Sequence, residues 1–247
     1  MSYSEFAYWY DELNNEANYN RLASSIEGIL AGHGIEKGIV ADLGCGTGEV
    51  SLRLAKHGYD MICVDQSADM LTVFREKIQS RYAKKLLLLQ QNLADLDLYG
   101  TIQAAVSTFD TLNHLPQSQL EKALGRISLF LEPGGVFVFD ANTPYKHAEI
   151  LAINRFEIES RGREGILTCT WNNRREPGQN ATRILLDVRQ NGKLLFSENF
   201  LEYAYPLEFW HNALQKAGFA VEKILDGESF TELEPTSQRY LVTAIKL

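Results

Sequence analysis

A glycine-rich turn is the segment of this chain best suited to bind a ligand. It reads Ile39-Val40-Ala41-Asp42-Leu43-Gly44-Cys45-Gly46-Thr47-Gly48-Glu49, an apolar run, a turn and the start of a helical stretch. Glycines in such a turn let the backbone approach a ligand without an intervening Cβ. The helix start leaves backbone N–H groups free, which favours a carboxylate or another anion. Asp42 adds a carboxylate at the end of the apolar run, suited to a ligand's amino group.

A second acid supports this interpretation. Asp65 ends the next apolar run, seventeen residues beyond Gly48, where a carboxylate can accept hydrogen bonds from both hydroxyls of a ribose. A glycine turn alone is weak evidence, because glycines interrupt many loops. The spacing is more informative: Gly44, Gly46 and Gly48 give G-x-G-x-G, whereas a dinucleotide fingerprint requires G-x-G-x-x-G. An NAD(P)-dependent oxidoreductase is therefore disfavoured.

The loop after the fourth apolar run is the third candidate segment. It contains Thr108, Phe109, Asp110 and His114, and in parallel α/β sheets ligands lie at the carboxyl ends of strands. His114 is positioned to be a general base. The alternative is that it caps or packs the following helix. Asp110 either orients a substrate amine or caps the turn.

The elements that must position these residues alternate between strand and helix. Apolar runs at 38–43, 61–65, 86–91, 104–108 and 136–140 are separated by amphipathic stretches at 49–57, 68–82 and 117–131. Strands that are apolar on both faces and separated by helices predict a parallel sheet covered on both sides. Residues 1–31 precede this part and are expected to form a cap of two helices.

The pattern changes after Asn142. Runs at 155–161, 165–174, 181–190 and 193–203 are predicted to be antiparallel strands, and the Asn191-Gly192 pair between the last two favours a tight hairpin. A helix at 206–217 and strands at 221–225 and 239–246 follow. We therefore predict one α/β domain, 1–145 with 205–247, carrying an antiparallel β insertion at 146–204 that forms a lid or a dimer surface.

Composition limits the classes of partner. The net charge is −8, and the chain lacks the basic stripe typical of nucleic-acid enzymes. Three cysteines without metal-ligand spacing predict no metal site. Because neither a signal peptide nor an apolar run of membrane-spanning length is present, we expect a cytoplasmic protein without a membrane partner.

The run from Asp42 to Gly48 resembles motif I of class I S-adenosylmethionine-dependent methyltransferases, typically D-x-G-x-G-x-G. The acid Asp65 and the following Ser67–Leu71 extend the resemblance, which is firm over about residues 38–142. It implies a Rossmann-like seven-stranded, mostly parallel sheet whose last strand is antiparallel. It also implies S-adenosylmethionine as cofactor and S-adenosylhomocysteine as product.

The resemblance assigns cofactor contacts residue by residue. Asp42, Leu43 and the backbone of Gly44, Cys45 and Gly46 would hold the methionine end, Asp65 the ribose, Gln66 and Met70 the adenosine, and Thr108 and Phe109 the cofactor's flank. Asn92 and Leu93 would face the adenine, although the family usually has Asp at the position of Asn92, and Asp95 is the alternative. Tyr10 and Tyr19 would contact the cofactor from the N-terminal segment, since aromatic faces attract a sulfonium cation.

The implied reaction is an in-line displacement on the sulfonium methyl group by an N or O nucleophile of a small molecule, with no metal and no covalent intermediate. His114 would be needed as a base only where the nucleophile arrives protonated. Two alternatives stay open: a catalytically silent cofactor-binding regulatory module, and a methyltransferase acting on RNA or a ribosomal component. The protein is expected to be a monomer or a homodimer formed through the insertion.

Overall fold

The core of the molecule is a seven-stranded sheet with the strand order β10-β11-β5-β4-β1-β2-β3. A computed structural model describes residues 5–14, 18–151, 154–162 and 165–247. Neighbouring strands pair in parallel except for β11, which is antiparallel to both β5 and β10. The strands are β1 (Ile39–Leu43), β2 (Asp60–Asp65), β3 (Leu86–Gln90), β4 (Ile102–Ser107), β5 (Leu131–Asn142), β10 (Phe219–Asp226) and β11 (Arg239–Lys246). The predicted Rossmann-like sheet with one antiparallel strand is confirmed.

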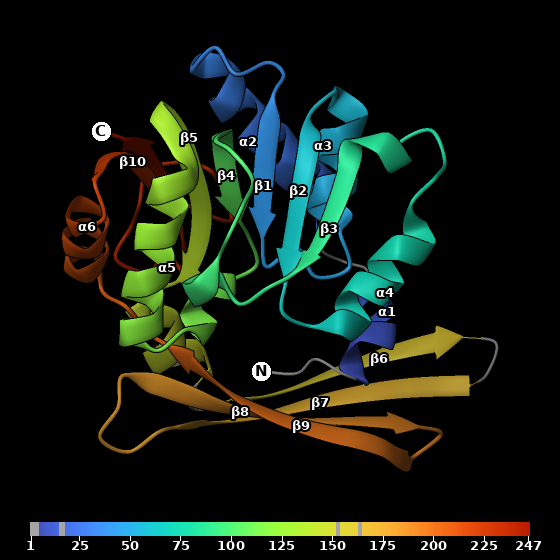
Figure 1. Ribbon diagram of the computed structural model, residues 1–247. Helices are drawn as coiled ribbons and strands as arrows, with labels where there is room; N and C mark the ends of the chain where they lie inside the picture. The colour runs from blue at the N-terminus through green and yellow to red at the C-terminus, as the bar shows by residue number, and fades with distance from the viewer. Residues whose placement is uncertain (1–4, 15–17, 152–153, 163–164) are drawn as a thin grey trace.

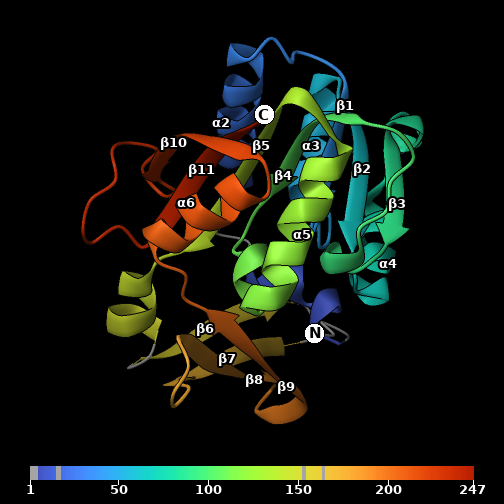
Figure 2. The same ribbon diagram turned by 60° about the vertical axis from the view of Figure 1, so that its left-hand side comes forward.

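Helices cover both faces of this sheet, as the strands' two-sided apolar pattern requires. One face packs against α2 (Tyr19–Gly32), α3 (Glu49–His57) and α4 (Ala68–Lys77). The other packs against α5 (Gln117–Phe130) and α6 (Leu207–Lys216), and the two views in Figures 1 and 2 show this layering. The helix predicted at 68–82 ends earlier, at Lys77, because the backbone of Ile78 is extended.

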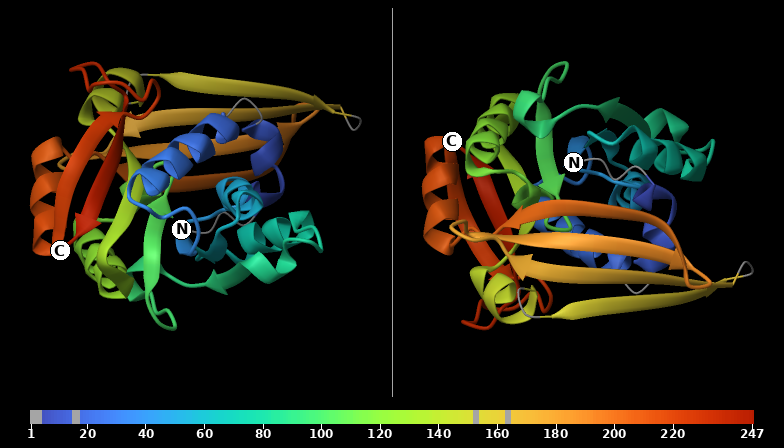
Figure 3. Two further views of the ribbon diagram at one scale, coloured as in Figure 1. Left: turned by 90° about the horizontal axis from the view of Figure 1, so that it is seen from above. Right: turned by 90° about the horizontal axis from the view of Figure 1, so that it is seen from below.

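The insertion forms a separate four-stranded antiparallel sheet in the order β6-β7-β8-β9. Its strands are β6 (Arg155–Gly162), β7 (Gly165–Arg175), β8 (Ala181–Gln190) and β9 (Lys193–Tyr203). The predicted hairpin is present, with positive φ at Asn191 and Gly192. This sheet lies across the carboxyl ends of the parallel strands, as Figure 1 shows from the side and Figure 3 from below. It therefore closes the edge at which a ligand is expected.

The N-terminal segment differs from its prediction. Instead of a first regular helix, it has a 3-10 turn, η1 (Phe6–Tyr8), and the four-residue helix α1 (Tyr10–Leu13). Such short helices are not stable alone, and the segment is held because Phe6 and Leu13 are buried against β7 and β8 of the inserted sheet. The parts of the predicted cap at 1–4 and 15–17 lie outside the described residues. No helix in the described part of the chain has the length and apolarity to cross a membrane.

Candidate active site

A cavity of about 370 Å³ lies at the carboxyl ends of the parallel strands. Most of the predicted cofactor contacts line it: Tyr10, Tyr19, Gly44, Cys45, Gly46, Asp65, Gln66, Met70, Asn92, Leu93, Thr108 and Phe109. His114 also lines it. The sequence therefore predicted a set of residues that the fold gathers around one space.

The glycine loop forms the floor of this cavity. Gly44, Gly46 and Gly48 all have positive φ, at 77°, 53° and 82°, a conformation that glycine adopts at little cost. A Cβ at Gly44 would lie 2.6 Å from Thr111 Oγ1, whereas a Cβ at Gly46 would have only Met70 Sδ nearby, at 4.0 Å. Thus Gly44 is required by packing, and Gly46 leaves room on the cavity side.

Asp65 is held in place by the backbone around it. Its Oδ2 accepts a hydrogen bond from Gly46 N at 2.9 Å, and its Oδ1 accepts one from Ser67 N at 2.8 Å. Burial raises the pKa of this carboxyl. Each carboxylate oxygen has two acceptor positions, so Asp65 retains capacity for two ligand hydroxyls.

Two predicted contacts do not line the cavity. Asp42 and Leu43 are buried at the end of β1, with 1% and 0% of their surfaces exposed. Asp42 Oδ2 accepts a hydrogen bond from Ser51 Oγ at 2.5 Å, which ties β1 to α3. Burial raises the pKa of Asp42 to about 6. Neither side chain is among the described residues that line the cavity, although Oδ1 of Asp42 is buried without a hydrogen-bond partner. The contacts of Asp42 and Leu43 with the cofactor therefore stay predictions.

The positions of Asn92 and Asp95 favour Asn92 as the residue that contacts the adenine. Asn92 lines the cavity, and its side-chain oxygen accepts a hydrogen bond from Ala94 N at 2.9 Å, which caps a short 3-10 helix. Asp95 is exposed and is not among the described residues that line the cavity. The adenine contact therefore stays a prediction for Asn92.

An aromatic group lies at one end of the cavity. The rings of Tyr19 and Phe109 are 5.0 Å apart, and Tyr10 lies on the same wall. The N-terminal segment that carries Tyr10 is fixed to the glycine loop, because Asp11 accepts hydrogen bonds from Thr47 Oγ1 at 2.5 Å and Lys77 Nζ at 2.6 Å. Access to the cavity thus depends on a segment that contacts the loop directly.

The loop after β4 has a strained backbone. Phe109 and Asp110 both have positive φ, 56° and 51°, and such a conformation costs about 1–2 kcal/mol for a non-glycine residue. It is fixed by Asp140, whose carboxylate accepts hydrogen bonds from Phe109 N at 2.9 Å and Asp110 N at 2.6 Å. Arg239 binds both carboxylates, at 2.9 Å to Asp140 and 2.8 Å to Asp110. This combination directs Asp110 away from β4 and toward the inserted sheet.

A second cavity, of about 340 Å³, lies between this loop and the inserted sheet. It shares Tyr10, Phe109 and His114 with the first cavity. Its other lining residues are Phe6, Asn14, Asp110, Asn142, Lys146, Leu151, Trp171, Asn173, Ile184, Leu186, Phe200, Glu202 and Arg239. Aromatic and aliphatic side chains of the insertion therefore face ionisable side chains of the core.

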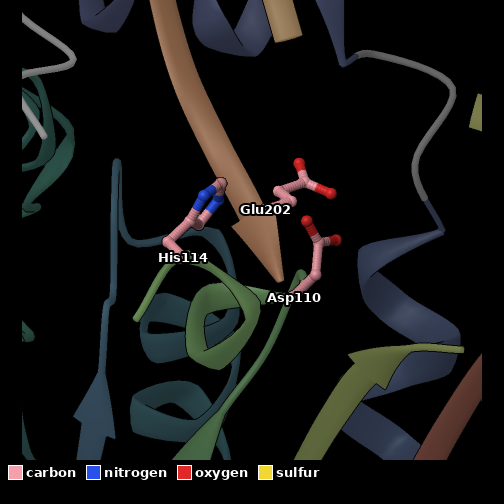
Figure 4. A group of neighbouring side chains, drawn as sticks. All are labelled: Asp110, His114 and Glu202. Atoms are coloured by element: carbon pink, nitrogen blue, oxygen red, sulfur yellow. The ribbon is translucent and has the colours of Figure 1, made fainter. Parts of the chain in front are cut away.

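Three ionisable side chains converge in this second cavity. One polar atom each of Asp110, His114 and Glu202 lies within 4.8 Å of the other two. Figure 4 shows the three side chains as neighbours, with the carboxylate of Asp110 next to that of Glu202. Burial lowers the pKa of His114. Burial, together with repulsion from Asp110, raises the pKa of Glu202 to about 8. Although burial opposes it, attraction to Arg239 keeps the pKa of Asp110 below its usual value.

The polar residues around Glu202 come from three elements. Asn142 Nδ2 at the end of β5 donates to Glu202 at 3.2 Å, and Asn142 Oδ1 accepts from Lys146 Nζ at 2.9 Å. His147 Nε2 lies 4.0 Å from Glu202. Burial lowers the pKa of His147 to about 4 and also lowers that of Lys146. Asn113 donates to the backbone oxygen of Tyr203 at 2.7 Å, which fixes the end of β9 against this group.

The sequence analysis missed Glu202, Lys146, Asp140 and Arg239. Asp140 and Lys146 lie six residues apart, but Glu202 and Arg239 lie far from them and from each other along the chain, so no local spacing connects the four. The available signal was indirect: Asp140 ends a predicted parallel strand, where site residues are expected. Glu202 is the penultimate residue of β9, and nothing in its alternating strand pattern distinguishes it from a solvent-facing acid.

Comparison with known proteins agrees with this geometry. Residues 40–135 match a family model described as a methyltransferase domain. The chain is 30% identical, over all of both chains, to “Putative methyltransferase” of Geobacillus sp.. It is also 27% identical to the dTDP-3-amino-3,4,6-trideoxy-alpha-D-glucopyranose N,N-dimethyltransferase of Streptomyces venezuelae, over 88% of this chain and 90% of that one. The crystal structure of a methyltransferase from Clostridium acetobutylicum matches the fold with a TM-score of 0.85, 24% identity and 98% coverage of both chains.

The chain belongs to the class I S-adenosylmethionine-dependent methyltransferase family. It is an enzyme that uses S-adenosylmethionine, and the alternative of a catalytically silent module is not supported. The residues of the first cavity suit that cofactor: Asp65 has free acceptor positions, Gly46 leaves the backbone open, and the aromatic group can attract a sulfonium. The first turn of α3 supplies free N–H groups for a carboxylate.

Proposed function

We propose that this enzyme transfers a methyl group to an N or O nucleophile of a small molecule bound in the second cavity. The observation that carries this proposal is the wall of Tyr10, Phe109 and His114 that borders both cavities. A donor in the first cavity and an acceptor in the second would meet at this wall. The proposed contacts to the donor are the predicted residues that line the first cavity.

The protein's contribution is mainly positioning. Bound S-adenosylmethionine supplies an electrophilic methyl group, which a nucleophile's lone pair attacks while the carbon–sulfur pair returns to sulfur. Holding two reactants in line can contribute about 7–11 kcal/mol. The aromatic group and the inserted sheet exclude water from the junction of the two cavities, at the wall of Tyr10, Phe109 and His114. The loop held by Asp140 fixes Phe109 and His114 there. His114 is the base predicted from the sequence for a nucleophile that arrives protonated.

The dimensions and the relatives favour a small acceptor. The second cavity, of about 340 Å³, is in the range of ordinary small-molecule sites. The relative from Streptomyces venezuelae acts, by its name, on the amino group of a nucleotide-linked sugar. The net charge of −8 argues against an RNA or ribosomal substrate. A cytoplasmic location, the domain limits 1–145 with 205–247 and 146–204, and a monomer or a homodimer formed through the insertion stay predictions.

Calorimetric titration of S-adenosylmethionine and S-adenosylhomocysteine tests the first half of the proposal. We expect micromolar binding of both, and a loss of at least about tenfold for Asp65→Ala, because charge-assisted hydrogen bonds contribute about 1.5–3 kcal/mol. The control is Asp60→Ala, at the opposite end of β2 with a 61% exposed side chain. Absence of binding by the unaltered protein would refute the proposal.

Methyl transfer to matched small molecules that differ only in carrying an amine or a hydroxyl tests the second half. We expect turnover of at least one of them, lost when Trp171 in the second cavity is replaced by alanine while cofactor binding persists. Turnover restricted to RNA, with a steep salt dependence, would overturn the small-molecule assignment.

A further inference from the structure

We propose that Asp110, His114 and Glu202 bind the amino group of a primary or secondary amine, and that Glu202 accepts its proton. This inference rests on the proposed function, because it takes the second cavity as the acceptor site. It deepens that function in two respects: it selects N over O as the nucleophile, and it assigns the proton to Glu202 instead of His114.

The geometry of the three side chains matches an ammonium group. One polar atom of each lies within 4.8 Å of the other two, and all three residues line the second cavity (Figure 4). A primary ammonium carries three N–H donors directed to the corners of a tetrahedron, so it can serve three acceptors from one position. A hydroxyl carries one donor and no charge, so it does not offset the negative charge of the buried carboxylates as an ammonium does.

The charges of the cavity favour a ligand cation beside Glu202. Arg239 is already bound by Asp110 and Asp140. Glu202 has 5% of its surface exposed, and among the described residues its only ion-pair candidate within 4.0 Å is His147, which is neutral at pH 7 because burial depresses its pKa to about 4. A buried carboxylate requires a cationic partner or a proton. Arg239, 2.8 Å from Asp110, and Lys146 repel any cation in this cavity. They repel a divalent metal more strongly than an ammonium, because the metal carries twice the charge.

The proton has a better acceptor in Glu202 than in His114. Burial lowers the pKa of His114, whereas burial and the neighbouring Asp110 raise that of Glu202 to about 8, and attraction to Lys146 and Arg239 limits the rise. A base is most effective when its pKa lies near the operating pH and near that of the donor. The ammonium N–H bond breaks toward a Glu202 oxygen and its electron pair stays on nitrogen, so a neutral amine faces the junction.

The acceptor need not be identified for a test. Two analogues of S-adenosylhomocysteine, with a CH group in place of sulfur and carrying a 2-aminoethyl or a 2-hydroxyethyl arm, place an amine or a hydroxyl beyond the methyl position. Titration calorimetry at pH 7 in two buffers of different ionisation enthalpy gives affinity and the number of protons released. Before binding, Glu202 is protonated and the arm of the amine analogue is an ammonium. In the complex the two groups share one of these protons, so about one proton is released.

We expect the amine analogue to bind at least about tenfold more tightly than the hydroxyl analogue and to release about one proton more. Glu202→Gln should remove both differences while S-adenosylhomocysteine still binds, which shows that the variant is folded. His114→Asn should keep the proton release. Glu157→Gln, on the exposed side of the inserted sheet with a 55% exposed side chain, should behave as the unaltered protein.

Equal affinities and equal proton counts for the two analogues would overturn the inference while leaving the proposed function intact. Loss of the proton release in His114→Asn, but not in Glu202→Gln, would return the role of base to His114. Failure of S-adenosylhomocysteine itself to bind the unaltered protein would instead refute the proposed function.

Discussion

Alanine substitutions at two neighbouring loop glycines should have separable effects. For Gly44→Ala, a positive φ of 77° costs about 1–2 kcal/mol. The new Cβ would lie 2.6 Å from Thr111 Oγ1, and relieving such overpacking costs about 1–3 kcal/mol. The total is about 2–5 kcal/mol. For a chain of this size that corresponds to a fall in Tm of roughly 10 °C.

Gly46→Ala should carry only the backbone part of that cost. Its φ is 53°, and the new Cβ would meet only Met70 Sδ at 4.0 Å. We expect a loss of about 1–2 kcal/mol of stability. Because Gly46 lines the first cavity, its methyl group would occupy ligand space, and affinity for S-adenosylhomocysteine should fall by about tenfold or more.

Calorimetric unfolding and titration of both variants measure these effects. Adding Thr111→Ala to Gly44→Ala leaves the Thr111 Cβ, at 3.0 Å, as the nearest atom of that residue. The loss of stability in the double variant should therefore be smaller than the sum of the losses in the two single variants. A Gly44→Ala protein within 1 kcal/mol of the unaltered chain, or a Gly46→Ala protein that is the less stable of the two, would refute the reasoning.

Three carboxylates give further predictions. The folded pKa of Asp42, about 6, exceeds its unfolded value, so the unaltered protein loses stability as pH rises from about 4 to 6. Asp42→Asn lacks this group. Its free energy of unfolding should therefore gain on that of the unaltered protein over this window, by at most about 3 kcal/mol, and the difference should stay constant above it. For Asp140→Asn, urea unfolding should report a loss of about 3–5 kcal/mol, because a buried arginine loses a charged partner; the same change at Asp97, whose side chain is 81% exposed, should be neutral. For Asp11→Asn, the affinity for S-adenosylhomocysteine should fall by about two- to fivefold, since the half-exposed ion pair with Lys77 contributes at most about 1 kcal/mol. An unchanged dissociation rate of the ligand in stopped flow would show that the N-terminal segment that carries Tyr10 does not restrain it.

The cofactor side of the molecule was predictable because its determinants are local. A glycine spacing of two, an acid before it and an acid ending the next strand all lie within residues 42–65, and periodicity alone fixed which segments are strands. The position of Tyr10 was harder, because its segment is not a regular helix and is held by the inserted sheet. The burial of Asp42 and its hydrogen bond to Ser51 were not predictable, since a sequence does not show which side of a strand end is buried. Its contact with the cofactor stays a prediction.

The charged residues of the second cavity could not be predicted in this way. Asp110, Lys146, Glu202 and Arg239 meet only after four separate segments have folded, and each is an ordinary charged residue in its own segment. The strained φ angles at Phe109 and Asp110 are equally invisible in the sequence, because they are imposed by hydrogen bonds to Asp140, thirty residues further along the chain. Contacts of this kind depend on the tertiary fold.

The chain leaves the core for the inserted sheet after the carboxyl end of β5 and returns just before α6, so the insertion is one continuous segment. Most of the second cavity's apolar wall belongs to this detour, whereas the glycine loop and Asp65 do not. A transplanted sheet from a related enzyme, joined between Asn142 and Tyr205, would therefore exchange that wall and keep the glycine loop and Asp65, provided that it also keeps the apolar contacts of β7 and β8 with Phe6 and Leu13. On the proposed function, acceptor choice is thus encoded by one continuous segment of the chain, and new specificities can arise there while the glycine loop and Asp65 are conserved.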